Sequence, residues 1–264
     1  MSLPPLIDAH IHLDSYSAEE QEALLFTLAG SGVEAVISVS MNLRSCEANL
    51  RLSSEQPGTI FPAFGYHPEQ PLPGAAELEQ LFRWMEHHAD RMIAVGEVGL
   101  PYYSAQEAAL KGAPFDRDGY IELLERFILF AKRYDKPIVL HAVYEDADIA
   151  CRLLERHHVT RAHFHWFKGS PATIERMAQN GYYISFTPDL LYEPDIRALA
   201  EIYPLSQVMA ETDGPWPFEG RFAEQTTHPR MTSDVIQAYC SIHGMTGTEG
   251  RQLFRDNTRR FYKL

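Results

Sequence analysis

The sequence contains little cysteine and no long apolar run. Its three cysteines, Cys46, Cys151 and Cys240, are odd in number and far apart, so neither a disulfide framework nor a cysteine-based zinc site is expected. The N-terminus lacks the basic region and apolar run of a signal peptide, and no stretch approaches the length of a membrane span. We therefore expect a cytoplasmic protein without membrane segments, whose thiols stay reduced.

Positive charge is also scarce. The 264 residues include 23 Lys and Arg against 36 Asp and Glu, which gives a formal net charge of −13. Such a chain gains nothing at long range from a phosphate backbone, which argues against nucleic-acid binding through a broad basic surface. Bound divalent cations can reverse the local sign of the potential, so a phosphate substrate stays compatible with this composition. No sequence feature indicates a stable protein partner.

The sequence shows no linker, internal repeat or low-complexity segment, and we expect residues 1–264 to form a single domain. Short apolar runs alternate with amphipathic runs along the whole chain. Eight of the apolar runs are predicted strands, at residues 6–7, 35–39, 59–64, 92–95, 137–140, 162–166, 182–186 and 207–210. The apolar stripe at 120–134 predicts the clearest helix, whereas 101–115 are predicted to form a loop.

Eight strands alternating with at least eight helices predict an α/β fold, a single (β/α)8 TIM barrel. The strands lack polar alternation, which fits strands that are buried on both faces. The alternative is an open doubly wound sheet. That fold would carry a glycine-rich phosphate turn after the first strand, and none is present.

Two histidines, His10 and His12, follow the first predicted strand. On an extended chain this spacing places both imidazoles on one face, as half of a metal site would require. Two hydrogen-bonded loop histidines would give the same pattern, so the pair alone is a weak signal.

Further metal-ligand types follow other predicted strands. In a parallel barrel the catalytic groups lie at the C-terminal ends of the strands. The residues found at those ends are His10, His12, His67, Glu97, His141, His165 and Asp213. This series exceeds what one tetrahedral ion needs and suits two divalent ions that share a carboxylate.

We assign His10, His12 and Asp213 to one ion and His141 and His165 to the other, with Glu97 as the bridge. Water held by such a pair has a lowered pKa and becomes the nucleophile. Asp213 is expected to orient that water or take its proton, so Asp213 and Glu97 are the predicted catalytic residues. The nitrogen-rich set favours zinc, while the oxygen ligands also permit magnesium or manganese.

Seven motifs carry a resemblance to a known family. In chain order they are DAHIHLD (8–14), GYHP (65–68), GEVGL (96–100), PIVLH (137–141), HWFKG (165–169), ETDGP (211–215) and NTRRF (257–261). The chain thereby resembles the TatD-type metal-dependent hydrolases of the amidohydrolase superfamily. The resemblance implies a (β/α)8 barrel, a two-metal centre and, commonly, deoxyribonuclease activity. It implies the same metal ligands, His10, His12, Glu97, His141, His165 and Asp213, and a role for His67 beside the substrate or its phosphate.

The chain departs from the family pattern at three places. Pro101 replaces a usual aspartate, the usual arginine shortly after His141 is missing, and Thr227-His228-Pro229 replaces an Asn-x-Pro pattern. Losing that arginine weakens the case for a bound phosphate.

Three functions therefore stay open. The first is a phosphodiesterase or deoxyribonuclease acting on DNA or a small phosphodiester. The second is a hydrolase of a small ester, amide or lactone on the same centre, and the third is a non-catalytic metal-binding protein.

Several other residues are weaker candidates. Lys168 and Arg221 are the best local cations for an anionic substrate, although either could be a solvated loop charge. His228 follows the eighth strand and could reach the mouth of the site. His163 shares a face with His165 and could be a hydrogen-bond partner of a ligand, but we expect it to be a hydrogen-bonded histidine inside the barrel. Aromatic residues in the strand-end loops suggest a rather apolar mouth.

Overall fold

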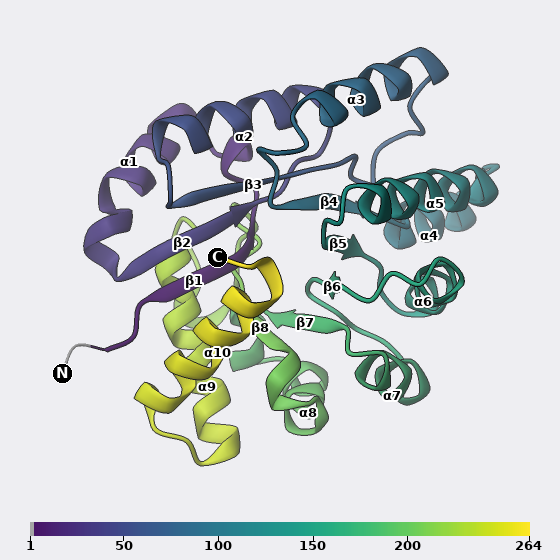
Figure 1. Ribbon diagram of the computed structural model, residues 1–264. Helices are drawn as coiled ribbons and strands as arrows, with labels where there is room; N and C mark the ends of the chain where they lie inside the picture. The colour runs from purple at the N-terminus through teal and green to yellow at the C-terminus, as the bar shows by residue number, and fades with distance from the viewer. Residues whose placement is uncertain (1–2) are drawn as a thin grey trace.

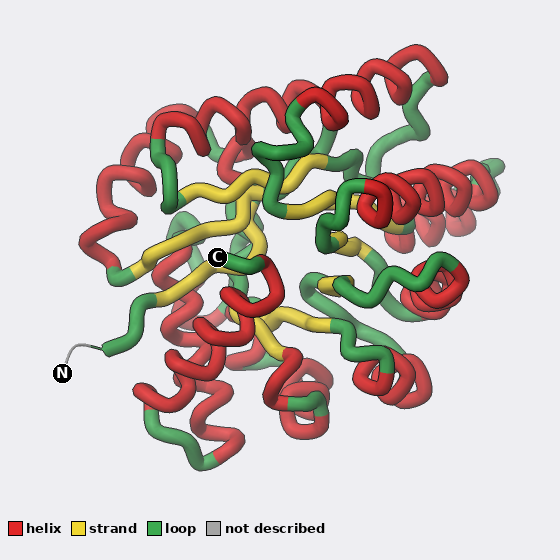
Figure 2. The backbone as a smooth tube through the Cα atoms, in the orientation of Figure 1, coloured by secondary structure: helices red, strands yellow, loops and turns green. Residues whose placement is uncertain are grey.

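A computed structural model describes residues 3–264 (Figure 1). Eight parallel strands form one sheet in the order β1 to β8, and the helices surround it (Figure 2). The strands are β1 (Leu6–Ile11), β2 (Val33–Ser38), β3 (Ile60–Phe64), β4 (Ala94–Gly99), β5 (Ile138–His141), β6 (Ala162–Phe164), β7 (Tyr183–Phe186) and β8 (Val208–Ala210). The predicted (β/α)8 barrel is confirmed.

The helices alternate with the strands, as the hydrophobic patterns predict. They are α1 (Ala18–Leu28), α2 (Leu43–Glu55), α3 (Ala75–His87), α4 (Tyr102–Leu110), α5 (Arg117–Arg133), α6 (Glu145–Arg156), α7 (Pro171–Gln179), α8 (Pro194–Ile202), α9 (Thr232–His243) and α10 (Gly247–Tyr262). The start of α10 is fixed by the capping box of Thr246 and Glu249. No helix among residues 3–264 is long and apolar enough to cross a membrane.

The prediction of a loop over 101–115 is wrong, because α4 occupies much of that segment. None of the α4 residues is buried, so the sequence has no amphipathic stripe there to reveal a helix. Helix-forming alanines and the ion pair of Glu107 with Lys111, one helical turn apart, support it instead.

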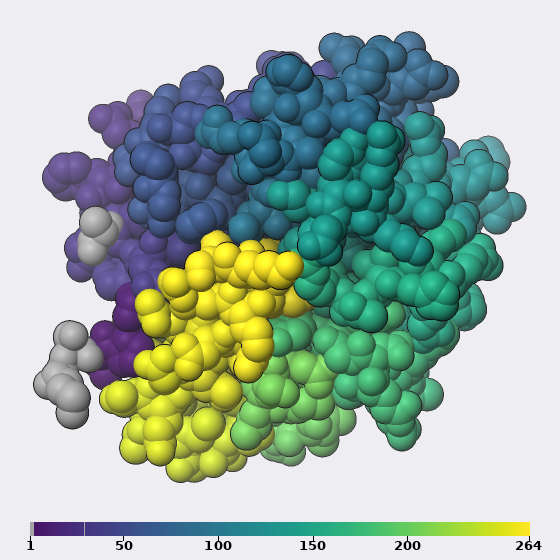
Figure 3. Space-filling view, viewed as in Figure 1, coloured from purple at the N-terminus to yellow at the C-terminus, as the bar shows by residue number. Residues whose placement is uncertain are grey.

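The two main parts of the core lie on opposite sides of the strands, and a small third cluster contains Phe218, Phe222 and Met231. The larger lies between the sheet and the surrounding helices and includes Leu124 and Phe127 of α5. The smaller fills the barrel with inward-facing strand residues such as Ala9, Val139 and Met209, and it includes residues from the end of α10. In the view of Figures 1 and 3, the yellow α10 lies over one end of the barrel.

The first and last strands meet through hydrogen bonds near their C-terminal ends. The Asp213 amide donates to the His10 carbonyl at 2.9 Å, and the His12 amide donates to the Gly214 carbonyl at 2.8 Å. The buried Asp8 carboxylate also accepts from the Thr212 amide at 3.0 Å. These bonds fix two ligand-bearing segments, which are about 200 residues apart in sequence, against each other.

Candidate metal centre

The barrel gathers the predicted ligands at the C-terminal ends of its strands. His10 lies in β1, Glu97 in β4 and His141 at the end of β5, while His165 follows β6 directly. Neighbouring backbones approach closely here. At Gly99 a Cβ atom would lie 1.9 Å from the carbonyl oxygen of His141, so only glycine allows β4 and β5 to bring their ligands this close.

Glu97 lies at the centre of the cluster and is fully buried. Its two carboxylate oxygens face different sets of imidazoles. Glu97 Oε2 lies 3.1 Å from Nε2 of both His10 and His12. Glu97 Oε1 lies 3.2 Å from His67 Nε2, 3.1 Å from His141 Nδ1 and 2.7 Å from His165 Nε2. This is the arrangement expected of a carboxylate that bridges two sites.

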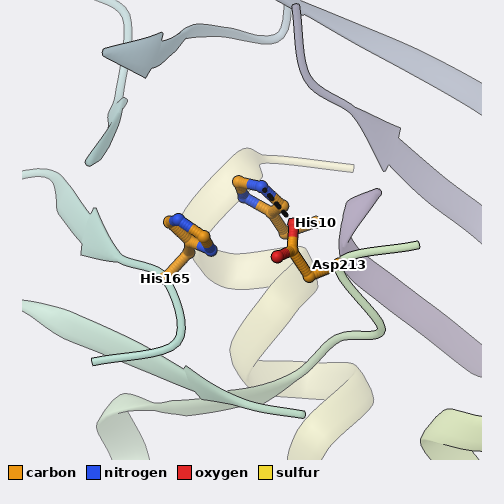
Figure 4. A group of neighbouring side chains, drawn as sticks. All are labelled: His10, His165 and Asp213. Carbon is orange, nitrogen blue, oxygen red and sulfur yellow. Dashed lines mark ion pairs between the residues drawn. The ribbon is translucent and has the colours of Figure 1, made fainter. Parts of the chain in front are cut away.

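Asp213 completes the cluster from the β8 side. Its Oδ1 lies 3.3 Å from His10 Nε2 and 3.5 Å from His12 Nε2. Figure 4 shows Asp213 beside His10, with His165 opposite. The rings of His10 and His165 are stacked with centroids 3.9 Å apart, so the two halves of the cluster are in direct contact.

The side chains form three overlapping groups whose ligand atoms lie within 4.8 Å of one another. The groups are His10, His165 and Asp213; His10, His12 and Glu97; and His67, Glu97 and His141. The sequence assigned His67 to the substrate, whereas the structure brings its imidazole into the cluster itself. His67 therefore has the geometry of a metal ligand as well as that of a substrate contact.

Two observations show that the cluster suits divalent cations, and the first concerns hydrogen bonding. Three polar atoms of the cluster are buried without a hydrogen-bond partner among the described residues: His10 Nε2, Glu97 Oε2 and Asp213 Oδ1. Each nevertheless lies within 3.3 Å of another of the three. Unsatisfied buried polar atoms are costly unless another group, here a cation, takes their lone pairs.

The second observation is electrostatic. Burial alone lowers the pKa of His12, but the carboxylates of Asp213 and Glu97 raise it to about 10. Burial raises the pKa of Glu97, yet the neighbouring imidazoles hold it well below its ordinary value. The site therefore favours positive charge beside ionised carboxylates, and a divalent cation can replace the imidazole protons.

Three carboxylates behind the cluster were not assigned from the sequence. Asp8 accepts from the His10 amide at 3.2 Å, and Glu211 accepts from the Trp166 amide at 2.8 Å. Glu69 Oε1 lies 3.4 Å from His141 Nε2. Asp8 and Glu211 lie inside the DAHIHLD and ETDGP motifs, so the sequence could have identified them as site residues. For Glu69 the only indication in the sequence is that it follows His67 by two residues.

His163 occupies the barrel interior as expected. Its Nδ1 lies 2.9 Å from the Tyr262 hydroxyl, and its Nε2 lies 2.6 Å from the Ser185 hydroxyl. Ser185 in turn donates to Glu211 at 2.5 Å. Burial lowers the pKa of His163 well below its ordinary value. His163 is thus a neutral, hydrogen-bonded core histidine that connects α10 to Glu211.

A cavity of about 750 Å³ opens beside the cluster. Its wall includes His12, His67, His141, His165 and Asp213, and it carries the aromatic rings of Tyr103, Trp166, Tyr192 and Trp216. Aromatic side chains therefore do line the cavity, as expected, but beside charged ones. Four further carboxylates, of Glu69, Asp189, Glu193 and Glu219, also line it.

Of the two basic residues that were predicted to bind the substrate, one lines the cavity and the other does not. Lys168 lines the cavity, where its Nζ lies 3.9 Å from Asp189 Oδ2 and 5.5 Å from the centre of the Trp166 ring. Arg221 does not line it and pairs with Asp234 at 2.6 Å. His228 is also outside it, with its Nε2 3.0 Å from Thr27 Oγ1.

Comparison with known proteins gives a consistent result. The family model described as "TatD related DNase" matches residues 7–263. An uncharacterized metal-dependent hydrolase of Haemophilus influenzae is 38% identical over 98% of this chain and 100% of its own. Human deoxyribonuclease TATDN3 is 26% identical over 80% of this chain and 78% of its own. The crystal structure of YjjV, a TatD homologue from Escherichia coli, superposes with a TM-score of 0.79 at 27% identity, over 98% of both chains.

Proposed function

Since the chain belongs to the family of TatD-related DNases, which includes metal-dependent hydrolases, we propose that it hydrolyses a phosphodiester at a two-metal centre. The observation that carries the proposal is the placement of Glu97, whose two oxygens face separate sets of imidazoles. In the proposed centre His10, His12 and Asp213 would hold one divalent ion, and His141 and His165 would hold the other. Glu97, whose carboxylate faces both sets of imidazoles, would be shared by the two ions, and His67 would be a further ligand or a substrate contact.

Such ions, when bound, supply a water of lowered pKa and neutralise charge that develops on the phosphate. The protein supplies the geometry. The Asp213 carboxylate faces the cavity with 12% of its side chain exposed, so it can accept a proton from a water that lies beside the cluster. Its amide bond to His10 fixes that carboxylate relative to β1, and preorganisation of this kind lowers the barrier of the chemical step.

The cavity wall supplies substrate contacts. Tyr103, Trp166 and Trp216 present aromatic surface on which a flat group such as a nucleobase can stack. Lys168 is the one Lys or Arg among the described residues that line this cavity, so it is the proposed side-chain partner of a phosphate oxygen. A cavity of this volume accommodates a small phosphodiester or a strand end.

A second candidate function is hydrolysis of a small uncharged ester or lactone. It is favoured by the charge of the cavity, where Lys168 lies close to Asp189 and further carboxylates surround it. The chain also lacks the arginine that TatD-type proteins usually carry after His141. A neutral substrate would enter such a cavity without the repulsion that a polyanion meets.

One experiment separates the two functions. Metal-free protein is reloaded with Zn²⁺, Mn²⁺ or Mg²⁺ and tested on single-stranded DNA, bis(p-nitrophenyl) phosphate, and a panel of aryl esters and lactones. The proposal expects phosphodiester cleavage that a chelator abolishes and that His141→Ala loses. Cleavage of esters or lactones with both phosphodiesters intact would establish the second function instead. Absence of turnover on every substrate with every ion would contradict both.

A further inference from the structure

The side chain of Glu69 lies between helix α4 and the candidate metal cluster. Neither the sequence nor the family assignment predicts this connection. It follows β3, two residues after His67, and 17% of it is exposed at the cavity wall. Its carboxylate accepts hydrogen bonds from the backbone amides of Tyr103 at 2.9 Å and Ser104 at 2.8 Å. The Ser104 hydroxyl donates to it as well. Glu69 is therefore bound to the first turn of α4.

Helix α4 needs an acceptor from outside its own sequence. Its N-cap residue is Pro101, which makes no side-chain capping bond, although the first amides of a helix have no partner within the helix. The usual family residue at this position, aspartate, would be able to supply such a bond. In this chain the carboxylate comes from Glu69, so α4 holds Glu69 in a fixed position.

The same carboxylate faces one of the proposed metal ligands. His141 Nδ1 lies 3.1 Å from Glu97 Oε1 and 3.2 Å from His165 Nε2, inside the cluster. On the other edge of the ring, His141 Nε2 lies 3.4 Å from Glu69 Oε1. Both carboxylates only accept hydrogen bonds when ionised. If a metal ion took the Nδ1 lone pair in the cluster, the ring proton would be left on Nε2, where Glu69 can accept it.

His10 and His12 lack such a partner. Their Nδ1 atoms are buried without a hydrogen-bond partner among residues 3–264. His141 Nε2 makes no hydrogen bond within the distance and angle limits either, but it is the one of these three outer nitrogens that has a carboxylate oxygen 3.4 Å away. That carboxylate is anchored by a helix that the sequence pattern did not reveal.

We propose that Glu69 is a positioning residue that fixes the tautomer and orientation of His141 so that Nδ1 faces the metal centre. The inference rests on the proposed two-metal centre. Carboxylates behind a metal-bound histidine typically change metal affinity by about 10–100-fold. We expect a loss of this size for one ion when Glu69 is replaced.

The test measures metal binding rather than turnover. Full-length wild type and variants are freed of metal and titrated with Zn²⁺ against a chromophoric chelator, and Co²⁺ spectra report the ligand field. Glu69→Ala removes both contacts. Glu69→Gln can keep an oxygen for the Ser104 amide while it presents an amide N–H to His141 Nε2, which favours the wrong tautomer, so it should also lose affinity.

Three control variants separate positioning from helix capping. Ser104→Ala removes only the hydroxyl bond to Glu69 and keeps the two amide bonds and the carboxylate beside His141. Glu193→Ala removes a carboxylate of the cavity wall away from the cluster. Both should bind Zn²⁺ as the wild type does. In Glu69→Ala/Pro101→Asp, a local cap is restored without a carboxylate at His141, so we expect thermal stability to recover but not metal affinity.

The outcomes are distinct. Wild-type affinity in Glu69→Ala, or full recovery of affinity in the double variant, would overturn the positioning role. Binding of a single ion by the wild type would refute the two-metal centre, and the same set of variants would then test Glu69 on that ion. An altered Co²⁺ spectrum in both Glu69 variants, with the control spectra unchanged, would support the role.

Discussion

Replacement of His163 by leucine tests how the barrel interior supports the metal centre. His163 is fully buried, and both of its ring nitrogens are in hydrogen bonds. The Ser185 hydroxyl donates its one proton to Glu211, so it must accept a hydrogen bond from the N–H at His163 Nε2. The other nitrogen of the neutral ring, Nδ1, then accepts from the Tyr262 hydroxyl. Leucine has a similar size and removes both bonds without opening a large cavity.

The expected loss follows from those two bonds. Each contributes about 0.5–1.5 kcal/mol to stability. Neither hydroxyl is left without a partner, since Tyr262 also lies 3.4 Å from the Ala9 carbonyl and Ser185 keeps Glu211. We therefore expect a loss of about 2 kcal/mol, or a decrease in Tm of roughly 4–8 °C for a chain of this size.

The assay is thermal unfolding in the presence of a chelator, with Tyr262→Phe as a control that removes only one of the bonds. Tyr262→Phe should lose about 1–3 kcal/mol, since it leaves the buried Nδ1 of His163 without a donor. The number of Zn²⁺ ions bound should be unchanged in both variants. A His163→Leu protein of unchanged Tm that binds fewer ions would refute the reasoning, because it would make His163 a ligand rather than a structural residue.

Three further predictions concern charged groups. Glu97→Gln should bind fewer ions per chain, as measured by elemental analysis, and lose hydrolysis while its circular dichroism spectrum is retained; full activity would exclude a bridging role. Burial and Arg230 lower the pKa of His228 from 6.5 to about 4, so the unfolded chain binds more protons between these values and stability should fall as pH decreases from 6.5 to 4. His228→Gln should flatten that part of the stability profile, and an unchanged slope would contradict the assignment. Lys168→Ala should raise KM for a phosphodiester while Arg221→Ala leaves it unchanged, because only Lys168 lines the cavity; equal effects would contradict this placement.

The sequence by itself determined the fold class and named most of the side chains that gather in the candidate metal centre. Alternating apolar and amphipathic runs predicted a (β/α)8 barrel because strands buried on both faces and helices with one buried face leave distinct periodic patterns. Once the barrel was predicted, the candidate ligands could be read from the strand ends, since parallel strands bring all of those ends to one face. His163 was also predicted as a core residue, and the structure gives it two buried partners.

Only the tertiary structure decided which side chains stand behind the ligands and which reach the cavity. Helix α4 has no buried face, so its sequence carries no periodic signal. Its first turn holds Glu69, 34 residues earlier in the chain, against His141. Arg221 and Lys168 both lie in loops after strands, yet Arg221 pairs with Asp234 and Lys168 enters the cavity. Contacts of this kind depend on loop paths and long-range packing, which local periodicity does not encode.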